Sequence, residues 1–294
     1  MKDISYDILD LMELYGADEN GIRTILENGK QPELLMALSP IRENLVDWME
    51  IAGDDRVLEI GSGYGALTGA LAWKAKEVWV LDSCLENLEV NKKRHQEMGN
   101  IHYHCSDWKA LMKEEKAESE LQGQLFDWVF LIGPKTREAS LEIGEKRNGN
   151  TWNRKAEEKA YGIRLFQRAA ELVKPGGHLV IAVQNSNSIK LLAGGELDDQ
   201  EIAMSLTDLQ ELFHVQMPGG ESSFYYPLPN YKLPAAIYSN QYLPAKGELP
   251  NLFAEYEKPR YRLFSEEAAY DAICEAGGFP QFANSYLVIW KKAW

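Results

Sequence analysis

The chain of 294 residues is poor in cysteine and has no excess of positive charge. Its three cysteines, Cys84, Cys105 and Cys274, are far apart and form no Cys-x-x-Cys pair. We therefore expect no metal site and a reducing compartment. The net charge of −14 opposes the phosphates of nucleic acids and the surface of an acidic membrane, so we expect no nucleic-acid partner.

Long apolar segments are also missing. No apolar run approaches the roughly 20 residues that a helix needs to cross a bilayer, so we expect no membrane insertion. The first 16 residues carry acids within their apolar pattern and lack the basic stretch and unbroken apolar core of a signal peptide. These observations favour a cytoplasmic protein.

The middle of the chain alternates between strand and helix patterns. Residues 3–50 have helical spacing, with Ser39 and Pro40 as an N-cap and first helical position. Strands are then predicted at 56–61, 77–82, 101–107, 126–133 and 178–185, with helices between them, a charged one at 108–123 included. This alternation predicts a parallel sheet with helices on both faces. A turn, "KPGG", precedes the fifth strand.

The pattern changes after the fifth strand. Residues 221–229 and 285–290 are predicted strands, and 266–279 a helix. Between them lies a segment rich in proline and tyrosine with no clear period. A long connection with little regular structure is usually functional, so we expect a substrate lid, although an arm packed on a neighbouring subunit fits equally well.

A glycine-rich loop joins the first strand to the first helix of the alternating region. The segment "VLEIGSGYGALTG", residues 57–69, has glycines at 61, 63 and 65. Such a loop suits a dinucleotide, since Gly61, Gly63 and Ala66 have the spacing GxGxxG/A. It also suits S-adenosylmethionine, because Glu59 to Gly65 fit the pattern (D/E)xGxGxG. A bare tight turn is the third reading.

Glu59 helps to separate these readings. A carboxylate two residues before the first glycine would repel a pyrophosphate, whereas it favours the sulfonium and ammonium of S-adenosylmethionine. Asp82 ends the second strand, where an acid can accept hydrogen bonds from ribose hydroxyls, or can cap the next helix. Asp107 and Trp108 follow the third strand, where they could bind an adenine, Asp107 being equally suited to a helix cap.

Five segments, "VLEIGSGYGALTG", "VWVLD", "CSDW", "FDWVFLIG" and "LVKPGGHLVIAV", together resemble class I S-adenosylmethionine-dependent methyltransferases. "LSPIRENLVDW", "FYYPLPNYKLPAAIYSNQYLP" and "FPQFANSYLVIW" resemble a bacterial group of such enzymes that is associated with glycosyltransferases of surface-polysaccharide synthesis. Unlike that group, this chain has a long polar segment after "LIG", at residues 134–162, so the group's substrates do not transfer directly.

The resemblance implies a Rossmann-like α/β fold with a seven-stranded, mostly parallel sheet. It implies an N-terminal helical cap at 1–50, a cofactor-binding core at 51–226, a Tyr/Pro-rich insertion and helix at 227–280, and a final core strand at 281–294. The cofactor is S-adenosyl-L-methionine. The residues implied to bind it are Glu59, Gly61, Ser62, Gly63, Gly65, Asp82, Ser83, Ser106, Asp107, Trp108, Ile132 and Gly133.

Methyl transfer needs positioning and exclusion of water more than a catalytic group, and only a hydroxyl acceptor requires a base. His214 and Asn185 are weak candidates for that role, and the strand ends lack the acids of metal-dependent enzymes. We expect metal-independent transfer to an oxygen of a saccharide-like or other small polar acceptor. A nicotinamide-dependent oxidoreductase, a non-catalytic partner of a glycosyltransferase, and a homodimeric state stay open.

Overall fold

The computed structural model describes residues 4–29, 31–106, 121, 123–135, 151–198, 201–249 and 261–294; of 151–155 it describes the backbone alone. The chain divides into two compact units. Unit 1 comprises Met1–Phe130 with Lys232–Pro234, and unit 2 comprises Leu131–Tyr231 with Ala235–Trp294. Strand β4, Phe126–Ile132, begins in the first unit and ends in the second.

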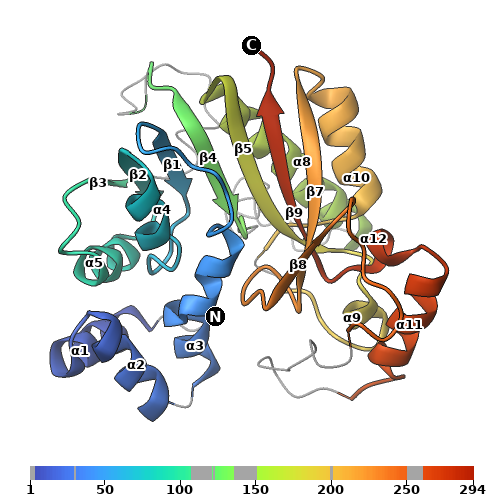
Figure 1. The fold of residues 1–294 in the computed structure, drawn as a ribbon, viewed down its shortest axis with the longest axis horizontal. Coiled ribbons are helices and arrows are strands. Elements are labelled where there is room, and N and C mark those ends of the chain that lie inside the picture. The colour runs from blue at the N-terminus through green and yellow to red at the C-terminus, as the bar shows by residue number, and fades with distance from the viewer. Residues whose placement is uncertain are drawn as a thin grey trace. The chain divides into compact units, whose positions relative to one another are not determined.

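Unit 1 contains the start of the predicted alternation. Its strands are β1 (Arg56–Ile60), β2 (Glu77–Asp82) and β3 (Ile101–Cys105), and its helices between them are α4 (Thr68–Lys74) and α5 (Leu85–Arg94). Strand β2 pairs in parallel with β1 on one side and β3 on the other (Figure 1). Val57 and Leu58 of β1 are both fully buried, as expected for a parallel strand that is covered on both faces.

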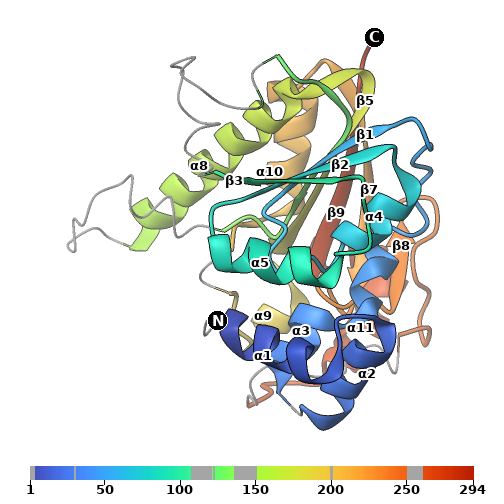
Figure 2. The ribbon, with the colours of Figure 1, turned by 90° about the vertical axis from the view of Figure 1, so that its left-hand side faces the viewer.

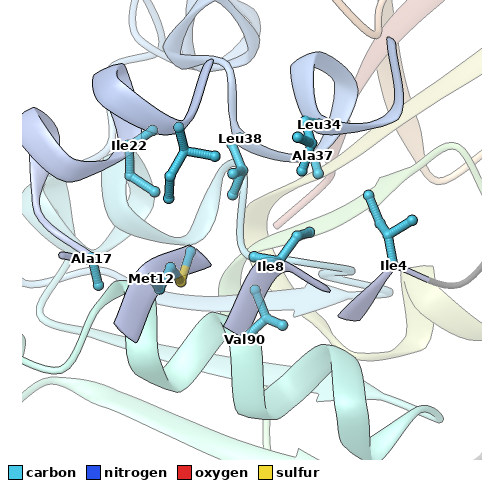
Figure 3. Close-up of a cluster of buried hydrophobic side chains, with 10 residues drawn as sticks. Ile4, Ile8, Met12, Ala17, Ile22, Leu34, Ala37, Leu38 and Val90 are labelled. Carbon is cyan, nitrogen blue, oxygen red and sulfur yellow. The ribbon is translucent and has the colours of Figure 1, made fainter. Parts of the chain in front are cut away.

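Helices precede these strands, as the sequence predicts. They are α1 (Ser5–Tyr15), α2 (Glu19–Asn28), α3 (Pro32–Leu38) and the 3-10 helix η1 (Pro40–Leu45). The apolar faces of α1, α2 and α3 meet in a buried cluster that includes Ile8, Met12 and Ile22, together with Val90 of α5 (Figure 3). Helix α5 thus lies between α1 and the strands (Figure 2). As predicted, Ser39 caps η1, its Oγ accepting from the Ile41 N–H at 3.3 Å.

Unit 2 combines parallel and antiparallel pairing. Its strands are β5 (Val173–Asn185), β6 (Ala203–Met204), β7 (Gly220–Leu228), β8 (Ala236–Ser239) and β9 (Ser285–Lys292). The last strand, β9, lies between β5 and β7 and is antiparallel to both. The helices of unit 2 are α8 (Thr151–Glu171), α9 (Ile189–Leu192), α10 (Leu206–Glu211), the π-helix η2 (Leu212–Gln216), α11 (Glu266–Glu275) and α12 (Phe279–Phe282).

The strand count differs from the prediction. The described residues contain nine strands rather than seven, because the two-residue β6 and the four-residue β8 carry too little pattern to be predicted. Strand β8 lies in the Tyr/Pro-rich segment, where it pairs with β7. The predicted "KPGG" turn is wrong, since residues 174–177 belong to β5, with Gly176 at a φ of +76°. The charged helix predicted at 108–123 falls almost wholly outside the described residues.

The predicted domain boundaries stay a prediction. The cap at 1–50 groups with the first strands in unit 1, and so does the short piece Lys232–Pro234 of the insertion. Within that unit the Asn44 side-chain amide of η1 donates to the Pro234 carbonyl at 2.9 Å. The insertion and the N-terminal cap are therefore in direct contact at this point.

Candidate functional site

The glycine loop after β1 has the open backbone that a ligand requires. Gly61, Gly63 and Gly65 have φ angles of +75°, +53° and +75°, a region that favours glycine. The Gly61 N–H donates to the Leu81 carbonyl at 2.7 Å, which ties the loop to the end of β2. A Cβ placed on Gly63 would meet no atom within 4 Å. The backbone at Gly63 is therefore accessible to a small molecule.

Asp82 connects the end of β2 to this loop. Its carboxylate is buried, with the residue 5% exposed. One oxygen, Oδ2, accepts from the Gly63 N–H at 2.8 Å, and Oδ1 accepts from the Cys84 N–H at 2.9 Å and from Asn87 Nδ2 at 3.2 Å. Two carboxylate oxygens offer about four acceptor positions, so capacity remains for a ligand hydroxyl. The two predicted elements, loop and acid, are brought together.

Glu59 is a buried acid directly before the loop. The residue is 4% exposed, and its Oε2 accepts from the Thr68 hydroxyl of α4 at 2.6 Å. Burial raises the pKa of Glu59 to about 7, and the negative charge of Asp82 raises it further. The hydrogen bond from Thr68 and the positive charges of Arg42 and Arg94 act in the opposite direction. The carboxyl of Glu59 is thus divided between its charged and neutral forms near neutral pH.

Helix α5 and its C-cap residue hold the loop through two polar side chains that the sequence analysis missed, Asn91 and His95. Asn91 is fully buried and its Nδ2 donates to Thr68 Oγ1 at 2.9 Å, while Tyr103 of β3 donates to Asn91 Oδ1 at 3.3 Å. His95 Nε2 lies 2.9 Å from the Gly65 carbonyl. Burial lowers the pKa of His95 to about 4, so its ring is neutral at pH 7 and its Nε2–H donates to that carbonyl.

This pair explains the third glycine of the loop. A Cβ on Gly65 would lie 2.4 Å from Asn91 Oδ1, so the position accepts no side chain. Asn91 and His95 are four residues apart and follow Leu88 on one face of α5. Polar residues on the buried face of an amphipathic helix are the signal that could have identified them.

The other predicted cofactor residues have different outcomes. Ser62 is buried within the loop, and Ser83 directly follows Asp82 at the end of β2. The Ser106 N–H donates to the Asp82 carbonyl at 3.1 Å. Asp107 and Trp108 lie outside the described residues. Ile132 and Gly133 belong to unit 2, where the Gly133 N–H donates to the Ala182 carbonyl of β5 at 2.9 Å.

The two weak catalytic candidates both lie in unit 2. Asn185 is fully buried; its Nδ2 donates to the carbonyls of Gln281 and Ala283 at 2.8 and 2.7 Å, and its Oδ1 accepts from the Asn187 N–H at 2.8 Å. Asn185 therefore has a structural role, since its side chain connects the end of β5 to the backbone before β9. His214 is exposed, and its Nε2 lies 3.4 Å from Ser222 Oγ. Ser222 is level with Leu179 in the middle of β5, six residues along that strand from Asn185.

The residues that the structure describes form no candidate metal site and no candidate membrane span. That part of the chain contains no group of three or more histidine, cysteine, aspartate or glutamate side chains that could hold a metal ion. None of the helices described is both long and apolar enough to span a bilayer.

Comparison with curated proteins gives a partial sequence match. No family model matches the chain. The protein-L-isoaspartate O-methyltransferase of Dictyoglomus turgidum is 37% identical over 65 residues, which are 21% of this chain and 30% of that protein. The chain thus matches less than a third of this curated relative's length.

Two solved structures give further likenesses. N-methyltransferase NodS from Bradyrhizobium japonicum WM9, in complex with S-adenosyl-L-homocysteine, is 15% identical with a TM-score of 0.41 and 99% of each chain covered. Phosphoethanolamine N-methyltransferase 1 of Haemonchus contortus, in complex with phosphoethanolamine and S-adenosylhomocysteine, is 12% identical with a TM-score of 0.47 and covers 99% of this chain and 49% of its own. These scores are too low to establish a common fold.

Proposed function

We propose that this protein is an S-adenosylmethionine-dependent methyltransferase. The observation that carries the proposal is the hydrogen bond from the Gly63 N–H to the Asp82 carboxylate, directly after the buried acid Glu59. It joins an open glycine loop to an acid that can accept from ribose hydroxyls. The curated relative, which matches a fifth of this chain, is named a methyltransferase, and this supports the proposal.

The described residues fit the chemistry of this cofactor better than that of a dinucleotide. S-adenosylmethionine supplies an activated methyl group on a cationic sulfonium. Two buried carboxyls, Glu59 and Asp82, border the loop, and they favour cationic groups. A pyrophosphate would instead meet these acids at the loop. The positive φ of Gly63 and the open space beside it allow the cofactor to approach the backbone.

The acceptor belongs to the proposal as well. We expect an oxygen of a saccharide-like or other small polar molecule, with no metal ion taking part. The Tyr/Pro-rich insertion supplies aromatic surface for such a molecule: the rings of Tyr238 and Tyr242 stack at 6.0 Å with an interplanar angle of 4°, and Tyr242 is 64% exposed. Aromatic faces of this kind bind the apolar faces of sugars while their hydroxyls donate hydrogen bonds.

The test is a calorimetric titration of the purified protein with S-adenosylhomocysteine, with NAD titrated in parallel. We expect micromolar binding of the first and no binding of the second. Binding of NAD alone would overturn the proposal and restore the oxidoreductase alternative. Methyl transfer from labelled cofactor to a panel of saccharides would then distinguish an enzyme from a non-catalytic partner protein.

A further inference from the structure

Two cysteines of unit 1 come together at the ends of neighbouring strands. Cys105 is the last residue of β3 and pairs with Asp82 of β2, while Cys84 is two residues after Asp82, at the N-cap of α5. The Cys105 sulfur lies 4.0 Å from the carbonyl oxygen of Ser83, the residue directly before Cys84. Standard peptide geometry places that oxygen about 2.8 Å from the Cys84 Cα, so the Cys105 sulfur is within about 7 Å of this Cα.

Both side chains lie on the face of the sheet that α5 covers. Tyr103 and Cys105 are two residues apart on β3, so their side chains point to the same face. The Tyr103 hydroxyl donates to Asn91 Oδ1 of α5 at 3.3 Å, and this identifies the face as the one packed against α5 (Figure 2). Cys84 begins the same helix. The two thiols therefore start from adjacent backbone positions on one side of the sheet, as a disulfide requires.

The two thiols differ in their access to solvent. Cys105 is exposed, whereas Cys84 is half-buried and its thiol donates to Oε2 of Glu86 at 3.1 Å. Burial raises the pKa of the Cys84 thiol, and Glu86 adds to this through its hydrogen bond and its charge, against a smaller effect of the Asn87 backbone. An external oxidant therefore meets Cys105 first, with Cys84 beside it as a second, protonated thiol.

We propose that Cys84 and Cys105 form a redox pair that a small-molecule disulfide oxidises to an intramolecular disulfide. With oxidised glutathione, the Cys105 sulfur attacks one glutathione sulfur, the glutathione S–S bond breaks, and one glutathione leaves with the proton of Cys105. The Cys84 sulfur then attacks the Cys105 sulfur, and the second glutathione leaves with the proton of Cys84. The two cysteines lose two electrons and two protons, and these reduce one glutathione disulfide to two thiols.

The pair is a modification site that goes beyond the proposed function and does not depend on it. Its members are 21 positions apart, so no Cys-x-x-Cys spacing marks them in the sequence. In a reducing compartment such a disulfide is transient, and an exposed thiol with a second thiol beside it is typical of a redox sensor. Disulfide formation removes the hydrogen that Cys84 donates to Glu86, directly after the acid Asp82.

The test is incubation of the reduced protein, as the whole chain, with excess oxidised glutathione. The remaining thiols are then alkylated, and peptide mapping by mass spectrometry without reduction locates each product. Cys84→Ser removes the second thiol and Cys105→Ser the first. Cys274→Ser is the matched control, because Cys274 is also half-buried but belongs to α11 of unit 2. Circular dichroism would establish that each variant is folded.

We expect the wild-type protein to yield a peptide pair that links Cys84 to Cys105, lighter by two hydrogens than the two reduced peptides. Cys84→Ser should instead keep one glutathione on Cys105, since no neighbouring thiol displaces it. Cys105→Ser should give no link, and Cys274→Ser should give the same link as the wild-type protein.

The wild-type map decides the proposal by itself, whatever the variants do. Glutathione retained on Cys105 while Cys84 is alkylated would overturn the pair, because the second thiol would then fail to reach the first. Alkylation of both Cys84 and Cys105 would overturn it as well, and so would a link from either of them to Cys274. Binding of S-adenosylhomocysteine is measured separately, so failure of the proposed function would leave the peptide map unchanged.

Discussion

Replacing Glu59 by glutamine is expected to remove a pH-dependent cost to stability. The folded protein holds the Glu59 carboxyl in a buried position where its pKa is about 7, against 4.5 for an ordinary carboxyl. Between these two values the folded state binds a proton that the unfolded chain has released. The free energy of unfolding therefore falls as the pH rises through this interval and is level above it.

The magnitude follows from the same two values. Each tenfold difference in proton affinity corresponds to about 1.4 kcal/mol, so Glu59 costs about 3 kcal/mol at pH 8 relative to pH 4.5. Glutamine carries no charge and its side-chain oxygen can still accept from the Thr68 hydroxyl. His95, with a pKa of about 4, makes the free energy of unfolding rise with pH below pH 6.5. This contribution is the same in the wild-type protein and in Glu59→Gln, so it cancels in the difference between them.

The assay is urea unfolding at several pH values between 5 and 8, followed by circular dichroism. We expect the wild-type protein to lose about 2 to 3 kcal/mol more than Glu59→Gln across this range. Glu50→Gln, which removes an exposed carboxylate of the same unit, controls for the loss of one negative charge. Equal pH dependence in the wild-type protein and Glu59→Gln would refute the reasoning, since Glu59 would then titrate as an ordinary carboxyl.

Four further predictions concern single side chains. Gly65→Ala should destabilise the protein by at least about 2 kcal/mol in urea unfolding, because its φ is positive and Asn91 occupies the space, whereas Gly53→Ala, with nothing within 4 Å, should be nearly neutral; similar values for both would contradict this. Asp82→Ala should weaken S-adenosylhomocysteine binding by about 1.5–3 kcal/mol in calorimetry, and unchanged affinity would refute the site. Asn185→Ala should cost about 3 kcal/mol of stability through loss of its three hydrogen bonds, and a stable variant with lost turnover would return Asn185 to an acceptor role. Tyr242→Ala should change stability by less than about 0.5 kcal/mol and lower the rate with a saccharide acceptor, so an unaltered rate would remove the stacked tyrosines from the acceptor site.

The sequence predicted those parts of the fold that depend on local pattern. The strands β1, β2, β3 and β7 and the helices α1 and α11 have apolar spacings that identify them before any contact is known. The loop could be recognised for the same reason, since three glycines after a buried strand specify a backbone with positive φ. Its link to Asp82 follows from the parallel pairing of β1 with β2.

The remaining parts depend on partners that are distant in the sequence. Strand β8 forms by antiparallel pairing with β7, and its four residues have no alternating pattern that would predict a strand. Asn185 looked like a residue near a reacting group, but its three hydrogen bonds go to residues 187, 281 and 283. The Tyr231 hydroxyl donates to Glu201 beside Gly133, and this contact joins segments that are separated by tens of residues. Side-chain contacts of this kind can be derived only from the packed structure.

The contact between α5 and the glycine loop has an evolutionary consequence. Asn91 fills the space where a side chain at position 65 would lie, and the ring of His95 lies 2.7 Å from a Cβ placed on Gly69. Positions 65 and 91 should therefore be inherited as a pair, and so should positions 69 and 95. In a relative that carries a smaller residue at 91, alanine at 65 would meet only the strain of the positive φ, whereas in one that keeps asparagine it would also clash with that side chain. The third glycine of the loop is thus constrained by a neighbouring helix as well as by its own backbone conformation.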